Sequence, residues 1–368
     1  MAADIKSILI YFGALGITLL CLHHCSKAKT QNRMVRFFGV LITALPLSLL
    51  AGLKALSVGT DSYNYMLIFQ NIYNDSFADC LIQSDFEKIF VLLVKVISVF
   101  FGKNDAFVFF GFECISLIIL IYSLLKLKDK LNPCVAFFLY FLVFYHTSLN
   151  IVRQGLAISL IALLIVKLVE KKYFQSAVVL FLAINVHLSS IIAVLFIFAA
   201  AVLKKYRNLS AKRIFYFFIL AVMLGTFSLS WNYIIALPIF SSYSKYVTES
   251  YDIGIGVFVS GFIYFAFPLI LSRNEIFSNY ETEVLFDISI MYIPIAFMGY
   301  FSEHATRLNL FPQMAIILFL AHLIHKIKIP SNRRFMLFFY FALFIIEYIV
   351  NYMISNQTNA YPYVFNVL

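Results

Sequence analysis

Apolar runs of membrane-spanning length recur along the whole chain and constrain its fold more than any other feature. Each run covers about 15–20 residues, which is roughly what an α-helix needs to cross the ~30 Å hydrocarbon layer of a bilayer. Hydrophobic residues make up 62% of the 368 positions and charged residues only 12%, which excludes an ordinary soluble domain. Because a helix satisfies its backbone hydrogen bonds internally, such runs predict an all-α polytopic membrane protein.

Basic residues lie in short clusters between the apolar runs, and these clusters indicate the topology. The formal net charge of +10 would suit a polyanionic partner, but this placement is what the positive-inside rule produces. We therefore expect no nucleic-acid partner, and we expect the clusters to face the cytoplasm. The clusters occupy positions 27–36, 126–130, 167–172, 204–213 and 326–334, with Arg273 standing alone.

Keeping every cluster on the cytoplasmic side predicts about twelve spans, with both chain termini outside. We expect a single integral membrane domain, 1–368, with outside loops near 57–87 and 232–252. The first run has no cleavage site of the signal-peptide kind, so it counts as a retained span. The predicted spans are 5–22, 35–53, 106–125, 134–149, 153–169, 173–186, 188–203, 214–231, 254–272, 284–301, 308–325 and 335–354.

Neighbouring cytoplasmic clusters must be separated by an even number of spans. Two stretches need a special topology to satisfy this requirement. The run 88–101 is short and contains lysines, so it predicts a re-entrant or interfacial helix rather than a span. A single span between Lys172 and Lys204 would put a basic loop outside. We therefore predict two short helices there, which turn at the outer face around His187.

Arg153 lies in the middle of an apolar run, where a charged residue is costly. An arginine near the bilayer core costs roughly 2.5–3.5 kcal/mol on insertion scales, so it must face protein or water and hold something anionic. The predicted topology places Arg307, His187 and Asp61 at the same outer level. Two arginines, a histidine and an aspartate at one level predict a functional site in an outer-face cavity.

Each of these residues also has a structural explanation, which the sequence leaves open. Arg153 would be accounted for by a carboxylate partner that pins two helices together. Glu303 precedes Arg307 at the i,i+4 spacing that would neutralise that arginine locally. His187 and Asp61 both suit tight turns.

The motifs of several enzyme classes are missing from the chain. There is no Gly-x-x-x-x-Gly-Lys-Ser/Thr loop for ATP, no Gly-x-Ser-x-Gly elbow and no His-Glu-x-x-His helix. No Asp-x-Asp is present to hold a metal-bound nucleotide sugar. We expect no cofactor and no metal, and the acidic pair Asp85 and Glu87 is a weak cation signal. Of five cysteines only Cys80 falls in an outside loop, so no disulfide is expected.

The order of several polar motifs resembles the EpsG family of bacterial polysaccharide polymerases, relatives of the Wzy-type O-antigen polymerases. The resemblance extends from Gly59 to about His325, and the order is more specific than any one motif. Two positions depart from the family pattern: Lys54 stands near a common arginine position, and Ile89-Phe90 replaces a common glycine. The matching segments are Gly59-Thr60-Asp61-x-x-x-Tyr65, Glu87, Asn150-x-x-Arg153-Gln154-x-x-Ala157, His187-x-Ser189, Leu237-Pro238 with Tyr243, Tyr246 and Tyr251, and Arg307-x-x-x-Phe311.

The resemblance implies a GT-C-like glycosyltransferase in the bacterial inner membrane, with its active site facing the periplasm. Such a protein would act in lipopolysaccharide biosynthesis as an O-antigen polymerase, and its substrate would be an undecaprenyl-diphosphate-linked oligosaccharide. The growing glycan would move from its lipid diphosphate to the non-reducing-end hydroxyl of a new repeat unit. Membrane lipids and a protein that regulates chain length are the further partners that the resemblance implies.

Roles for individual residues follow from the same resemblance. Arg153 or Arg307 would stabilise the leaving diphosphate through paired, charge-assisted hydrogen bonds. Asp61 or His187, with Glu87 as a further candidate, would take the acceptor proton. The expected catalytic residues are Asp61, Arg153, His187 and Arg307, and the expected substrate-binding residues are Tyr65, Glu87, Asn150, Gln154, Ser189, Tyr246 and His304.

Other functions for a membrane protein with an outer cationic site remain open. A flippase or transporter of lipid-linked oligosaccharide would need the same cations, but transporters tend to show repeated, interrupted helices that this sequence lacks. An O-antigen ligase would use the same donor with lipid A as acceptor. A membrane O-acyltransferase would instead need a cytoplasmic acyl donor.

Overall fold

The computed structural model describes residues 5–28, 32–76, 78–80, 86–206, 256–272, 276, 279–298 and 307–366. Within these ranges the regular structure is helical, apart from one isolated bridge between Lys54 and Phe365. Seven of the described helices are long and apolar enough to cross a membrane. The chain is therefore an all-α membrane protein, as the apolar runs predict.

The membrane-length helices match seven of the predicted spans to within a few residues. Two of them change geometry along their length: α7 passes through the π-helical segment Phe141–Tyr145 into α8, and α20 continues into the π-helical segment Ile349–Ile354. Their bounds are α1 Ile5–Lys27, α2 Arg33–Leu53, α6 Asp105–Lys126, α7 Pro133–Tyr140, α8 His146–Asn150, α9 Val152–Val169, α19 Leu310–Lys326 (after the 3-10 turn Arg307–Asn309) and α20 Pro330–Tyr348.

The remaining described helices are shorter. A helix does form over 88–101, and the stretch after Lys172 does consist of two short helices that turn at His187, as predicted. Whether the 88–101 helix is re-entrant or interfacial stays a prediction. The bounds are α3 Ser62–Asn74, α5 Lys88–Phe101, α10 Tyr173–Ile184, the 3-10 segment Leu188–Ala193, α11 Val194–Tyr206, α14 Gly256–Leu271, α16 Tyr280–Ile290 and α17 Tyr292–Met298.

The predicted span 284–301 is interrupted at Met291, between α16 and α17, and its last residues, 299–301, lie outside the described residues. Pro294 explains the break: it has no N–H for the carbonyl of Ile290, and its ring clashes with that carbonyl in a continuous helix. The predicted span 214–231 lies outside the described residues. The count of twelve spans and the GT-C-like fold therefore stay predictions.

Asparagine caps define where several helices begin. The side chain of Asn132 accepts a hydrogen bond from the amide of Cys134 at 3.0 Å, and Pro133 occupies the first helical position. Asn32 and Asn104 cap α2 and α6 in the same way, each at 2.9 Å. A capping side chain satisfies amides that have no partner inside the helix, which fixes the start at that residue.

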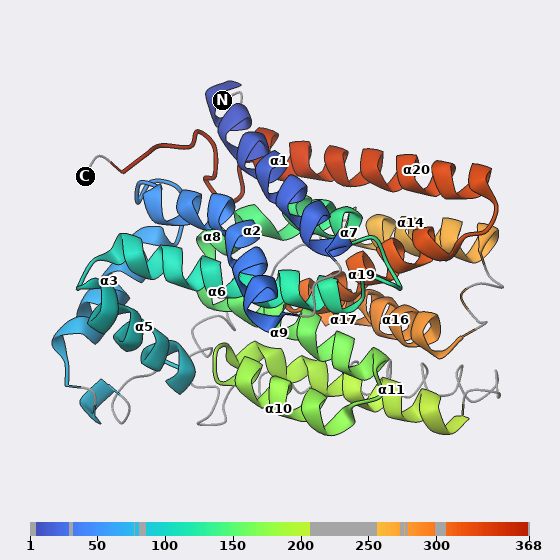
Figure 1. The fold of residues 1–368 in the computed structure, drawn as a ribbon, viewed down its shortest axis with the longest axis horizontal. Helices are drawn as coiled ribbons and strands as arrows, with labels where there is room; N and C mark the ends of the chain where they lie inside the picture. Colours follow the sequence, from blue (N-terminus) through green and yellow to red (C-terminus); the bar gives the residue numbers. More distant parts are fainter. Residues whose placement is uncertain are drawn as a thin grey trace.

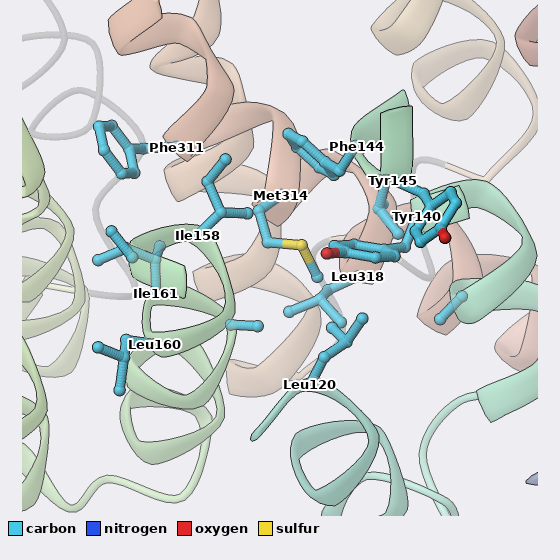
Figure 2. Close-up of a cluster of buried hydrophobic side chains, with 14 of the residues drawn as sticks. Leu120, Tyr140, Phe144, Tyr145, Ile158, Leu160, Ile161, Phe311, Met314 and Leu318 are labelled. Atoms are coloured by element: carbon cyan, nitrogen blue, oxygen red, sulfur yellow. The ribbon is translucent and has the colours of Figure 1, made fainter. Parts of the chain in front are cut away.

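The core is built around α9, which lies in the middle of the molecule (Figure 1). Of its residues 83% are buried, against 28% of the spanning window in α1 and 22% in α20, so the latter two are peripheral. Figure 2 shows Ile158 of α9 beside Met314 of α19, with Leu318 of α19 and Tyr140 of α7 in the same core. Gly155 permits the close approach of α8, because a Cβ there would lie only 2.7 Å from Cβ of Ser148.

Basic clusters from four loops of the described chain gather at one end of the helical bundle. Lys128 Nζ donates to the carbonyl of Ser26 at 3.2 Å, and Lys130 forms a 3.0 Å ion pair with Glu281. At the same end Tyr173 and Tyr280 hydrogen-bond through their hydroxyls at 2.7 Å. The loops after α1, α6, α9 and α19 thus share one end, in agreement with the partition that the positive-inside rule predicts.

The C-terminal tail returns to the opposite end, beside the first loop. The amide of Gly59 donates to the carbonyl of Asn359 at 3.3 Å, and the amide of Asn366 donates to that of Leu53 at 2.7 Å. Tyr363 bonds both Ser7 and Leu50, each at 2.8 Å. The hydrophobic pattern of the sequence did not predict the packing of this tail, because its hydrogen bonds are made largely by backbone groups.

We predict that labelling of single cysteines will separate the two ends of the bundle. On a cysteine-free background, Tyr63→Cys and Gln357→Cys should react with an impermeant thiol reagent from the same side of the membrane. Ser331→Cys, at the start of α20, should react only after permeabilisation, because α20 and its extension separate positions 331 and 357. Reaction of positions 63 and 357 from different sides would contradict this fold.

Candidate functional site

A kink between α8 and α9 organises the candidate site. Ile151 leaves the helical conformation, with φ −105° and ψ 71°, and α9 restarts at Val152. From this kink Asn150 therefore reaches the first loop. Arg153 reaches Glu87, and Gln154 reaches Arg307. The central motif of the sequence is thus the hub that connects the other motifs.

Asn150 holds the first loop. Its side-chain oxygen accepts hydrogen bonds from Thr60 Oγ1 at 2.9 Å and from the amide of Asp61 at 2.7 Å. Gly59 is required because its φ is +100°, where L residues are strained, and a Cβ there would lie 3.2 Å from the carbonyl of Leu149. This hydrogen bonding fixes the backbone at Asp61.

Among the described residues, the Asp61 carboxylate has no recorded structural partner. It precedes α3 but makes no capping hydrogen bond to that helix. It also forms no ion pair within the described ranges, and it is half-buried. A positioned carboxylate without a partner is what a general base or a ligand-binding group requires.

Arg153 is already paired. Its Nη1 lies 2.7 Å from Oε2 of Glu87, with the two side chains 23% and 14% exposed. The guanidinium also lies over the rings of Phe86 and Phe90, 4.9 Å and 5.4 Å from their centroids. Tyr65 contacts the same group. The geometry is therefore that of the helix-pinning alternative, with a carboxylate and aromatic faces neutralising the charge.

Glu87 also holds the turn that carries His187. Its Oε1 accepts from the amide of Leu188 at 2.8 Å and lies 3.6 Å from Nδ1 of His187. The amide of Ile89 donates to the carbonyl of Asn185 at 3.1 Å, so backbone contacts strengthen the same junction. One carboxylate thus joins α9, the start of α5 and the turn after α10.

The environment sets the protonation states of Glu87 and His187. Burial disfavours the Glu87 anion, but His187, Arg153 and the Leu188 amide outweigh burial and lower its pKa to about 2. Burial lowers the pKa of His187, and Arg153 and Arg307 lower it further against the opposing effect of Glu87. At neutral pH Glu87 is therefore ionised, while His187 is neutral and able to accept a proton.

Arg307 is the more available arginine. Its carbonyl accepts from Nε2 of Gln154 at 2.9 Å, which fixes its backbone beside α9, and its side chain is exposed. In the part of the chain that the structure describes, its guanidinium forms no ion pair. Glu303, which would neutralise it at the i,i+4 spacing, lies outside the described residues.

Several buried polar atoms at this site have no hydrogen-bond partner among the described residues. They are Nε of Arg153, Nδ1 of His187 and Oγ of Ser189. Buried polar atoms in native proteins are nearly always satisfied, so this group, beside an arginine without an ion-pair partner in the described ranges, is a candidate site for a polar ligand. Tyr246, His304 and the predicted loop 232–252 lie outside the described residues.

Sequence reasoning missed two buried charged residues beneath the first loop, Lys54 and Glu113, which influence each other electrostatically. Lys54 Nζ donates to the carbonyl of Val58 at 2.7 Å and to Ser62 Oγ, and it lies 4.4 Å from the ring centroid of Phe109. Burial lowers the pKa of Lys54 to about 7, and Glu113 opposes that shift. The signal was present, because a glutamate within the apolar run 106–125 is as costly as Arg153. Lys54 supports the loop from below and does not face outward beside Asp61.

Comparison with known proteins places the chain in a family. The family model for EpsG matches residues 37–365, nearly the whole chain. The chain belongs to the EpsG family. This EpsG-family protein is accordingly a membrane protein of the polysaccharide polymerase type. No curated protein and no solved structure matches it.

We predict strong coupling between Arg153 and Glu87 in this EpsG-family protein. Arg153→Met or Glu87→Gln alone strands the other charge in a partly buried site, whereas the double variant strands neither. The double-mutant cycle should therefore give a coupling of about 1–3 kcal/mol in thermal unfolding of the detergent-solubilised protein. The more exposed Lys130–Glu281 pair serves as the matched control and should couple by less than about 1 kcal/mol. Equal coupling in the two pairs would contradict a central role for Arg153–Glu87.

We also predict opposite pKa shifts of His187 in two variants. Arg153→Met removes a positive charge that lowers the pKa, so the pKa of His187 should rise. Glu87→Gln removes a negative charge that raises the pKa, so that pKa should fall. Titration of ¹⁵N-histidine-labelled protein by NMR, with His187→Gln to assign the signal, measures both. Shifts of the same sign would contradict the geometry.

Proposed function

We propose that this EpsG-family protein is an undecaprenyl-diphosphate-linked oligosaccharide polymerase, of the kind that builds O-antigen for lipopolysaccharide. The observation that carries the proposal is that a guanidinium, Arg307, and a carboxylate, Asp61, both lie around the start of α9, and neither has an ion-pair partner among the described residues. Gln154 positions the first and Asn150 the second. One group suits a departing diphosphate and the other suits an attacking hydroxyl.

Arg307 is our choice for the group that stabilises the leaving diphosphate. The donor loses its lipid diphosphate as the bond from the sugar anomeric carbon to the phosphate oxygen breaks, and negative charge develops on that oxygen. A planar guanidinium donates paired hydrogen bonds to such an anion, and the positive end of the α9 dipole favours it further. The charge of Arg153 is neutralised by Glu87, so its role is to hold the site together.

Asp61 is our choice for the base, with His187 as the alternative. As the acceptor hydroxyl attacks the anomeric carbon, its proton must pass to a protein group. Glu87 suits this poorly, because a carboxyl whose pKa is lowered to about 2 has little affinity for a proton. Asp61 lacks a competing partner in the described ranges, whereas His187 is neutral but held beside Glu87.

The site belongs on the periplasmic side of the bacterial inner membrane in this proposal. It lies at the end opposite the basic loops, and the positive-inside rule assigns those loops to the cytoplasm. The energy for transfer comes from the sugar–diphosphate bond, so no nucleotide is needed. A protein that regulates chain length would act on the same outer face.

Reconstitution with purified lipid-linked repeat units tests the proposal. Wild-type protein should form long lipid-linked chains, and Asp61→Asn and Arg307→Lys should each reduce the rate on the order of 100-fold, as losses of transition-state contacts do. Arg33→Lys, at the other end of the molecule, is the matched control and should retain full activity.

The same experiment separates the competing functions. A ligase would leave the repeat units unjoined until lipid A is added. A flippase or transporter would form no glycosidic bond under any condition. Either result would overturn the polymerase assignment, whereas full activity of Arg307→Lys would overturn the role given to Arg307.

A further inference from the structure

A cavity of about 280 Å³ opens at the basic end of the bundle, far from the candidate site. It lies between the starts of α7 and α20 and the end of α19. Its polar lining comes from Asn132, His325, Arg333 and Arg334, and apolar side chains such as Ile324 and Leu337 form the rest. No carboxylate lines it.

The cationic groups of this cavity are available to a ligand. Arg333, Arg334 and His325 are all exposed, and none of them forms an ion pair with another residue in the described ranges. The nearby Lys130, by contrast, is neutralised by Glu281. Two adjacent guanidinium groups without carboxylates form a site for a phosphate group rather than for a sugar alone.

The surroundings of the cavity face lipid. Only 22% of the spanning window that begins at Pro330 is buried, so α20 lies at the periphery of the bundle. Phe338, one turn after Arg334, is 77% exposed, and Ile329 is 55% exposed. A molecule held at the arginines therefore has an apolar helix surface beside it, along which acyl chains can lie.

We propose that this cavity binds the phosphate headgroup of an anionic phospholipid at the cytoplasmic surface of the membrane. Basic pockets between helices on the cytoplasmic side are suited to anionic headgroups, because their charges complement each other in an apolar setting. The lipid-linked substrate is a different molecule at the opposite end of the bundle. The inference is thus independent of the polymerase proposal and survives its failure.

Native mass spectrometry of delipidated protein, with phosphatidylglycerol, phosphatidylcholine or inorganic phosphate added, tests the proposal. Wild-type protein should bind phosphatidylglycerol in preference to phosphatidylcholine. Arg333→Gln with Arg334→Gln should reduce that preference on the order of tenfold or more, at roughly fivefold per basic residue. Arg333→Lys with Arg334→Lys keeps the charge and should keep most of the preference.

The control variant is Lys326→Gln with Lys328→Gln, which removes the same charge from the same end but from outside the cavity lining. It should bind phosphatidylglycerol as the wild type does. Equal loss in both double glutamine variants would show diffuse surface attraction and overturn the proposal. Binding of inorganic phosphate alone at this cavity would also overturn the proposal, because it would indicate a free anion as the ligand. If the Arg→Gln variant fails to fold by circular dichroism, each single Arg→Gln variant decides in its place.

Discussion

The ion pair between Arg153 and Glu87 is the constraint on which the candidate site depends. Neither charge is tolerable alone at this depth, because a buried ion without a partner costs several kcal/mol. Together they lock the first turn of α9 to the start of α5. The second oxygen of Glu87 then receives the Leu188 amide, which fixes the turn that carries His187. Three segments far apart in sequence meet through one carboxylate.

The two arginines of the site differ in their surroundings because of this pairing. From sequence, either of them suits a diphosphate. In the fold, Arg153 is enclosed by Glu87 and two phenylalanine rings, whereas Arg307 is held by its backbone and leaves its guanidinium exposed. The same distinction separates the acids, because Glu87 is committed to structure and Asp61 is only positioned by Asn150.

The molecule also separates its charges into two ends with different chemistry. At one end Arg153, Glu87 and His187 are half-buried and act on one another, while Arg307 is exposed. At the other, basic side chains gather on loops, and the cavity of Arg333 and Arg334 keeps its positive charge unneutralised in the described residues. Mostly apolar side chains of α6, α9 and α19 fill the middle and separate the charges of the two ends.

The sequence by itself determined the fold class, the places of most helices and the grouping of the polar motifs. Apolar length and basic loops depend only on local composition, and even the turn at His187 followed from counting charges. The tertiary structure decided which charge pairs with which. The partners Glu87 and Arg153 are 66 positions apart, and Lys54 was joined to Glu113 by the packing of α2 on α6. The break at Met291 also needed the structure, since apolar length alone does not register a proline. Pairing depends on side-chain distance in three dimensions, which a linear pattern of hydrophobicity does not contain.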